Sequence, residues 1–237
     1  MSESVDELEQ QWKASGTDAD EASYLRACVR AGRLPQVMLQ LAAHLGHPAA
    51  RMVFGGSAPP ESADLGKWVA GFDRYGKEAL VRAAIAAARY PLPLWELKRP
   101  NDRLPQSALD AAEGWVLNQD EAHVSAAEKA GESVANADRS GDGEADDAQQ
   151  LAGQTFDADM GVHIAADMAA EAAHLAGDMG EAEDVAQAVQ TAEVILGISR
   201  KGAAGELLKG TIRDAICSEL VPWALGYGDP IRERQTS

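Results

Sequence analysis

Apolar residues recur at helical spacing along most of this chain. Val37, Leu41 and Leu45 stand four residues apart, so they fall on one face of a helix. Thr17 belongs to the residue types that cap helix N-termini, and it predicts the start of a helix. Residues 78–90 are apolar on nearly every side, which predicts a helix buried in the interior. Because no segment alternates apolar and polar residues as a strand does, we expect an all-α protein, an alanine-rich multi-helix bundle or irregular helical array of about nine to eleven helices.

Turn-forming residues divide the chain at two places. Residues 55–60 (Gly-Gly-Ser-Ala-Pro-Pro) predict a linker between an N-terminal helical module, 1–56, and a main alanine-rich helical domain, 61–237. Within the main domain, residues 138–147 combine acidic side chains with glycine and serine, and we interpret them as an acidic loop. The expected organisation is therefore two helical parts, the larger of which contains one acidic loop between two helical halves.

Composition supports the helical prediction and narrows the class of protein. The chain holds 46 alanines among 237 residues, and alanine is the best helix former and loses no side-chain entropy on burial. Two cysteines are too few for a disulfide scaffold or a multi-cysteine zinc fold. No apolar run approaches the roughly 18–20 residues that span a bilayer, and the first residues lack the features of a secretory signal. We expect a cytoplasmic protein with reduced thiols, no cofactor and no membrane partner.

The negative charge is concentrated in one part of the chain. Residues 101–200 hold 21 acidic and 4 basic side chains, which accounts for the whole net charge of −17. The segments on either side are balanced, with 12 residues of each sign in 1–100 and 5 of each in 201–237. With a net charge of −17, the chain is not a general nucleic-acid binder, because such a protein needs a basic surface. The acidic block predicts either a partner-facing surface or a solvated face.

A polar stripe follows one face of the helix that we expect between about residues 148 and 179. Its members are three or four residues apart, the spacing that places side chains on one side of a helix. Histidine and carboxylate one turn apart can bind a transition metal, but one helix rarely closes a metal site and no HExxH motif is present. We therefore interpret the stripe as a partner-binding face without a metal. It consists of Asp159, His163, Asp167, Glu171, His174 and Asp178.

The acidic loop also resembles the first part of an EF-hand calcium loop. Oxygen-bearing residues stand at four ligand positions, and glycine occupies the sixth position. Two positions depart from the motif, because Ala145 replaces the β-branched residue at position 8 and Gln149 at position 12 cannot supply a bidentate carboxylate. We favour an acidic linker over a calcium site. The weak candidate ligands are Asp138, Ser140, Asp142 and Asp146.

One polar turn and the helix after it carry a family resemblance. After Leu94-Trp95-Glu96, residues 99–105 read Arg-Pro-Asn-Asp-Arg-Leu-Pro, and residues 108–115 read Ala-Leu-Asp-Ala-Ala-Glu-Gly-Trp. This stretch is similar to the immunity protein family of bacterial polymorphic toxin systems, an all-helical family with a P-x-D-x-R-P turn before an A-(L/I)-E-A-A-(R/E)-x-W helix. The chain departs from the pattern at Leu104, an extra residue, and at Asp110, which replaces a glutamate. The residues of this motif that we single out are Pro100, Asp102, Arg103, Pro105, Trp95 and Trp115.

The resemblance covers about residues 76–180 and implies a cytosolic immunity-type protein that binds and neutralises a cognate bacterial toxin. It assigns no catalytic residue. We expect the turn itself to be structural, with Asp102 and Arg103 capping and pairing at the helix junction, Pro105 starting the next helix and Trp115 packing behind it. Recognition then falls to the acidic helical surface, which suits a toxin with a basic surface.

Two other functions stay open. One is a helical scaffold or adaptor that mediates protein–protein contact or self-association without catalytic activity. The other is a metal-dependent helical protein that uses the polar stripe or the acidic loop. The chain contains no P-loop, no GxSxG motif and no HExxH motif, so we expect no enzyme.

Overall fold

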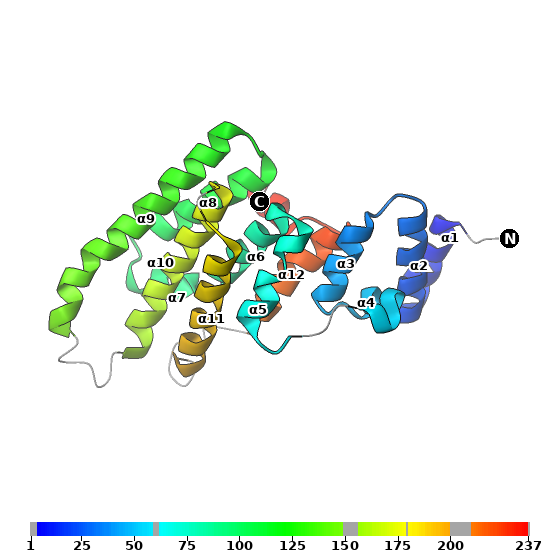
Figure 1. Cartoon of the computed structure of the whole chain (residues 1–237), viewed down its shortest axis with the longest axis horizontal. Coiled ribbons are helices and arrows are strands. Elements are labelled where there is room, and N and C mark those ends of the chain that lie inside the picture. The colour runs from blue at the N-terminus through cyan, green and yellow to red at the C-terminus, as the bar shows by residue number, and fades with distance from the viewer. Residues whose placement is uncertain (1–3, 59–61, 149–155, 179, 200–209, 237) are drawn as a thin grey trace. The chain divides into compact units, whose positions relative to one another are not determined.

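The computed structural model describes residues 4–58, 62–148, 156–178, 180–199 and 210–236 (Figure 1). Over these residues the chain forms thirteen α-helices, two short 3-10 helices and no strand, so the all-α prediction is confirmed. None of the described helices is long and apolar enough to cross a membrane. The chain divides into two compact units, the first made of residues 1–62 and 217–237, the second of residues 63–216.

The first unit consists of short helices, and side chains cap the N-termini of α1, α2, α4 and α13. The backbone N–H of Glu7 donates to the Ser4 hydroxyl (3.3 Å), and the N–H of Ser4 donates back to the Glu7 carboxylate (2.8 Å). Thr17 accepts a hydrogen bond from the N–H of Asp20 (3.3 Å), so the predicted helix start at Thr17 is confirmed. The helices are α1 (Val5–Ser15), α2 (Asp18–Arg30), α3 (Gln36–His44), α4 (Pro48–Phe54), the 3-10 helix Gly55–Ser57, the second half of α12 (Ile212–Leu225) and α13 (Pro230–Gln235).

Residues 217–237 belong to this first unit, whereas the sequence pattern assigned them to the main domain. Tyr227 shows why. Its ring stacks on Trp12 with 5.2 Å between ring centroids, and its hydroxyl donates to the buried Glu21 carboxylate (2.6 Å). Burial, together with the bond to Glu21, raises the pKa of the Tyr227 hydroxyl. These contacts join residues more than 200 positions apart, so the spacing of apolar residues within one helix could not predict them.

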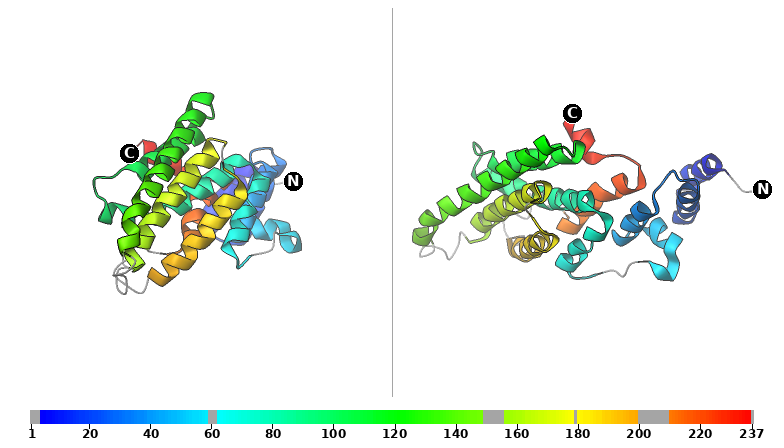
Figure 2. Two further views of the ribbon diagram at one scale, coloured as in Figure 1. Left: turned by 60° about the vertical axis from the view of Figure 1, so that its left-hand side comes forward. Right: turned by 45° about the horizontal axis from the view of Figure 1, so that its top comes forward.

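The second unit is built around α6 and α10. Every residue from Ala79 to Ala88 of α6 is buried, as its apolar pattern predicted. The helix α10 contacts α6, α7, α8, α9 and α11, and Figure 2 shows α9, α10 and α11 side by side. The elements are α5 (Leu65–Ala70), the 3-10 helix Asp73–Tyr75, α6 (Lys77–Arg89), α7 (Leu92–Lys98), α8 (Leu104–Leu117), α9 (Glu121–Ala148), α10 (Phe156–Ala176), α11 (Ala182–Ser199) and the first half of α12.

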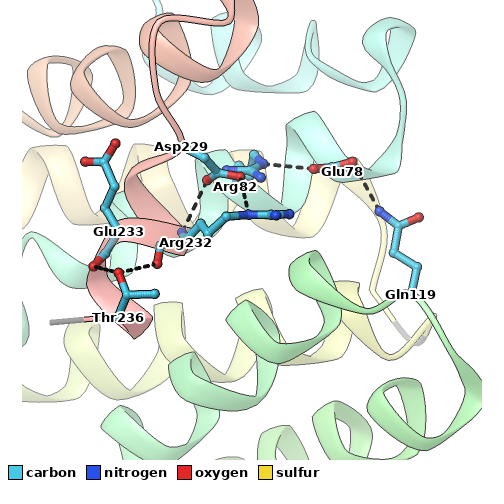
Figure 3. Close-up of polar contacts among 7 residues, drawn as sticks. All are labelled: Glu78, Arg82, Gln119, Asp229, Arg232, Glu233 and Thr236. Carbon is cyan, nitrogen blue, oxygen red and sulfur yellow. Dashed lines mark hydrogen bonds and ion pairs between the residues drawn. The ribbon is translucent and has the colours of Figure 1, made fainter.

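Two short helices with a proline in their first turn contribute to the thirteen described α-helices, a number close to the nine to eleven expected. The first turn of α7 contains Pro93, and α13 starts at Pro230. Proline is tolerated in a first turn because its missing N–H has no helical partner there. In α13 the Asp229 carboxylate supplies the cap by accepting from the N–H of Arg232 (3.4 Å), as Figure 3 shows. These prolines, which could also end a preceding helix, therefore lie in the first turn of a new one.

Arg82 places a charge on the buried helix α6. Its Nε donates to Glu78 Oε1 one turn earlier (3.1 Å), and Gln119 Nε2 donates to the second oxygen of that carboxylate (3.1 Å; Figure 3). The Arg82 side chain is buried, so this pairing offsets part of the cost of removing its charge from water. The contact with Gln119 also ties the segment that follows α8 to α6.

The stretch 138–147, expected as an acidic loop, is helical. It forms the last part of α9, which runs without interruption to Ala148. Once a helix is nucleated, each added residue gains one hydrogen bond, and alanine and glutamate propagate it well. Gly141 and Gly143 each oppose this by about 1 kcal/mol, which a long helix tolerates. The turn prediction gave too much weight to these two glycines.

Candidate functional site

A groove of about 460 Å³ lies between α9, α10 and α11 and contains part of the predicted polar stripe. We call it the acidic groove. Three carboxylates line it, and none of its described lining residues is lysine or arginine. Its walls also carry apolar and small side chains, so a partner would meet both charge and hydrocarbon. The lining residues are Val134, Ala135, Ile164, Asp167, Met168, Ala170, Glu171, His174, Asp184, Gln187, Ala188 and Thr191.

Two helices supply the carboxylates of the acidic groove. Asp167 and Glu171 stand one turn apart on α10 and therefore share a face. Asp184 comes from the first turn of α11, where its carboxylate accepts a hydrogen bond from the N–H of Glu181 (3.2 Å). Negative charge is favourable at this end of a helix. The groove thus collects acidic groups from two segments that the sequence separates by more than ten residues.

Glu171 is the most enclosed of the three carboxylates. Its side chain is half-buried, whereas Asp167 and Asp184 are exposed at the rim. Burial raises the pKa of Glu171, and the neighbouring charges of Asp184 and Asp167 raise it further. All three causes disfavour the ionised form of Glu171, so ionising this carboxyl group costs free energy. A cation bound in the groove would lower that cost.

His174 forms part of the wall and fixes how closely α9 and α10 approach. A Cβ atom at Gly131 of α9 would lie 2.8 Å from His174 Nε2 and 3.2 Å from the carbonyl oxygen of Ala170. The imidazole therefore occupies the space that the missing side chain of Gly131 leaves open. His174 lines the acidic groove, but its packing role against α9 is the clearer one.

Asp178 lies beyond the groove and ends α10. It is a non-glycine residue with a left-handed backbone conformation (φ 63°), and its carboxylate pairs with Lys77. The Lys77 ammonium also donates to the carbonyl oxygen of Ala176 (3.0 Å) and lies 4.5 Å from the ring centroid of Trp115. A cation at a helix C-terminus stabilises the unpaired carbonyl groups there. The predicted binding residue Asp178 is thus a helix-terminating residue.

The structure places the remaining stripe residues and the calcium-loop candidates by their backbone alone. Asp159 and His163 fall on the first turns of α10, and their side chains lie outside the described residues. The four candidate calcium ligands fall on the helical backbone of α9, so the chain does not form the loop that would wrap around a cation, and their side chains lie outside the described residues. Among the described side chains, no group of three or more His, Cys, Asp or Glu residues is placed to hold a metal ion.

The turn that carries the family resemblance joins α7 to α8. Trp95 Nε1 donates to the carbonyl oxygen of Asp102 (2.9 Å), and the Asp102 carboxylate accepts from the N–H of Leu104 (3.0 Å). Pro105 is buried in the first turn of α8, and Trp115 is buried on the same helix. Pro100 and Arg103 are exposed. The described side chains show no ion pair between Asp102 and Arg103, because Asp102 caps the backbone of α8 instead.

Comparison with known proteins adds no relative. No protein-family model matches the chain, and neither the curated proteins nor the solved structures contain a match. The resemblance to immunity proteins therefore depends on the residues of this turn and of the adjoining helices alone and remains a prediction. Sequence reasoning found Asp167, Glu171 and His174 through their helical spacing but missed Asp184. The acidic first turn of the next helix was the available signal, although nothing in the sequence pairs it with α10.

Replacing Glu171 with glutamine is expected to stabilise the protein near neutral pH by a fraction of 1 kcal/mol. Because the folded-state pKa of Glu171 is raised, the ionised carboxylate disfavours folding above that pKa. As pH falls through the raised pKa toward the ordinary value of a glutamate, the wild type gains a proton and the advantage of Glu171→Gln disappears. Thermal unfolding measured near pH 7 and near pH 4 tests this. Glu132→Gln removes an exposed charge from α9 and should show no such convergence.

Proposed function

We propose that this chain is a non-catalytic, immunity-type binding protein that neutralises a cognate bacterial toxin by binding its basic surface in the acidic groove. The observation that carries the proposal is the composition of the groove, which has three carboxylates and no lysine or arginine among its described lining residues. The family resemblance of the α7–α8 turn supports the choice of a toxin as partner. The scaffold or adaptor alternative is the outcome to expect if no toxin binds.

The electrostatics of the acidic groove favour a cationic partner. Burial raises the pKa of Glu171, and repulsion from the neighbouring charges of Asp184 and Asp167 raises it further. A lysine or arginine side chain entering the groove would replace this repulsion by attraction. The net charge of −17 adds a long-range field that increases the rate at which a basic protein arrives.

The expected result is a fast, salt-sensitive association that depends on the groove carboxylates. The partner to test is the purified product of a toxin-like gene next to the gene of this protein, and stopped-flow mixing gives the association rate. Substituting Asp167→Asn, Glu171→Gln and Asp184→Asn together should lower that rate about tenfold at low salt. The effect should shrink at high salt because ions screen exposed charges.

A second triple variant distinguishes the effect of the groove carboxylates on the association rate from the effect of the net charge. Asp110→Asn, Glu132→Gln and Glu193→Gln remove three exposed carboxylates from the same acidic block but outside the groove. This variant should keep most of the association rate and should still protect cells that express the toxin. An association rate that does not change with salt, or equal losses in both triple variants, would rule out the groove as the binding site.

A further inference from the structure

A second cavity, of about 380 Å³, lies at the turn between α7 and α8. It differs from the acidic groove because two arginines line it. Its apolar wall comes from α7, and its polar side comes from the turn and the start of α8. The lining residues are Leu92, Trp95, Glu96, Arg99, Pro100, Asp102, Arg103 and Gln106.

Arg99 is held in place by the aromatic ring at the base of this turn. Its guanidinium lies 4.6 Å from the ring centroid of Trp95, close enough for a cation–π interaction. Trp95 is buried and is itself fixed by its hydrogen bond to the carbonyl oxygen of Asp102 (2.9 Å). The backbone N–H of Arg99 bonds to the carbonyl oxygen of Trp95 (2.7 Å). The cation is therefore positioned before any ligand arrives, which lowers the entropy lost on binding.

The two guanidinium groups keep their charge available. Among the described side chains, neither Arg99 nor Arg103 forms an ion pair with a carboxylate, and both are exposed. Asp102 lines the same cavity, but its carboxylate accepts the N–H of Leu104 (3.0 Å) and caps α8. Glu96 is the one lining carboxylate without a described hydrogen bond, and it opposes the binding of an anion.

We propose that this cavity binds an oxyanion, a carboxylate or a phosphate group, between Arg99 and Arg103. The planar donor fork of arginine matches the oxygen pairs of both groups. The apolar wall of Leu92 and Trp95 would contact the body of the ligand. The site is independent of the acidic groove and of the proposed toxin, and it gives the α7–α8 turn a binding role beyond that of a helix junction.

Titration of the full chain with two probes tests the proposal. Inorganic phosphate and benzoate, which presents a carboxylate on an apolar ring, are each added to the protein while backbone amide NMR shifts are followed. Saturable shifts at residues of the turn support the site, and the probe that binds more tightly identifies the ligand chemistry. Arg103→Gln should weaken binding at least about tenfold, the effect of losing a hydrogen bond to a charged group.

Three further variants make the test specific. Arg99→Gln should also weaken binding, whereas Glu96→Gln should tighten it by removing the opposing charge. Arg74→Gln is the matched control, because Arg74 also lies over an aromatic ring, that of Tyr75 (5.1 Å), but outside the cavity. Arg103→Gln should keep the wild-type melting temperature, since no described contact depends on that side chain. The absence of saturable binding by either probe, or equal binding by wild type and Arg103→Gln, would overturn the proposal.

Discussion

Replacing Arg89 with methionine is expected to lower the free energy of unfolding by about 3 kcal/mol. Arg89 on α6 holds the Glu113 carboxylate of α8 through its Nε and Nη2 atoms, each 2.9 Å from Glu113 Oε1. Glu113 is only 1% exposed, so loss of the guanidinium weakens the neutralisation of a buried charge. Removal of one partner of a buried ion pair costs about 3–5 kcal/mol, and the partial exposure of Arg89 favours the lower end. Urea unfolding at neutral pH measures the change.

A double variant separates charge burial from lost packing. When Glu113→Leu accompanies Arg89→Met, both charges of this pair are removed, and apolar replacements of buried ion pairs are often neutral or stabilising. The double variant should therefore recover most of the loss caused by Arg89→Met alone. Arg74→Met serves as the control, because Arg74 is exposed and should change stability by less than about 0.5 kcal/mol. If both arginine variants lose equal stability, the Arg89–Glu113 pair does not hold α6 against α8 as described.

Features that depend on one helix alone could be predicted from the sequence. The apolar pattern of residues 78–90 predicted the buried α6, because a helix without a polar side has no face to turn toward water. The spacing of Asp167, Glu171 and His174 placed them on one face, and all three line the acidic groove. These inferences use only the helical period, which is a local property of the chain.

Features that depend on pairing between helices could not be predicted in this way. Asp184 joins Asp167 and Glu171 only because α11 packs on α10, and periodicity contains no information on which helices meet. Tyr227 reaches Glu21 through a contact between distant parts of the chain for the same reason. The carboxylate stripe was therefore predicted in part, whereas the groove required the structure.

The remaining differences between prediction and structure lie at residues that are compatible with two kinds of local structure. Pro93 and Pro230 could end a preceding helix or begin a new one, and both occupy first turns. Residues 138–147 contain turn-forming glycines beside strong helix formers, and the helix already running through α9 prevails. In each case the local residue types permit both structures, and the neighbouring element decides between them.

Replacing Gly177 with valine is expected to lower the free energy of unfolding by about 3 kcal/mol, at the upper end for an overpacked contact. Gly177 is buried at the end of α10, where it meets Glu128 of α9. A Cβ atom at this position would lie 2.9 Å from the backbone nitrogen of Glu128 and 3.1 Å from its Cα. Because these are backbone atoms, α9 and α10 must separate to admit the side chain. The melting temperature should fall by roughly 6–12 °C.

Three companion variants of Gly177→Val identify the cause of this loss. Gly177→Ala should show a smaller loss of the same kind, since it adds only the Cβ atom. Glu128→Ala should not rescue Gly177→Val, because the collision involves the backbone of α9 and not only the Glu128 side chain. Gly56→Val is the control, because a Cβ atom at Gly56 has no neighbour within 4 Å. Since α9 and α10 form two walls of the acidic groove, Gly177→Val should also weaken binding of the proposed toxin at temperatures where the protein is still folded. Wild-type stability in Gly177→Val would show that the two helices do not approach this closely.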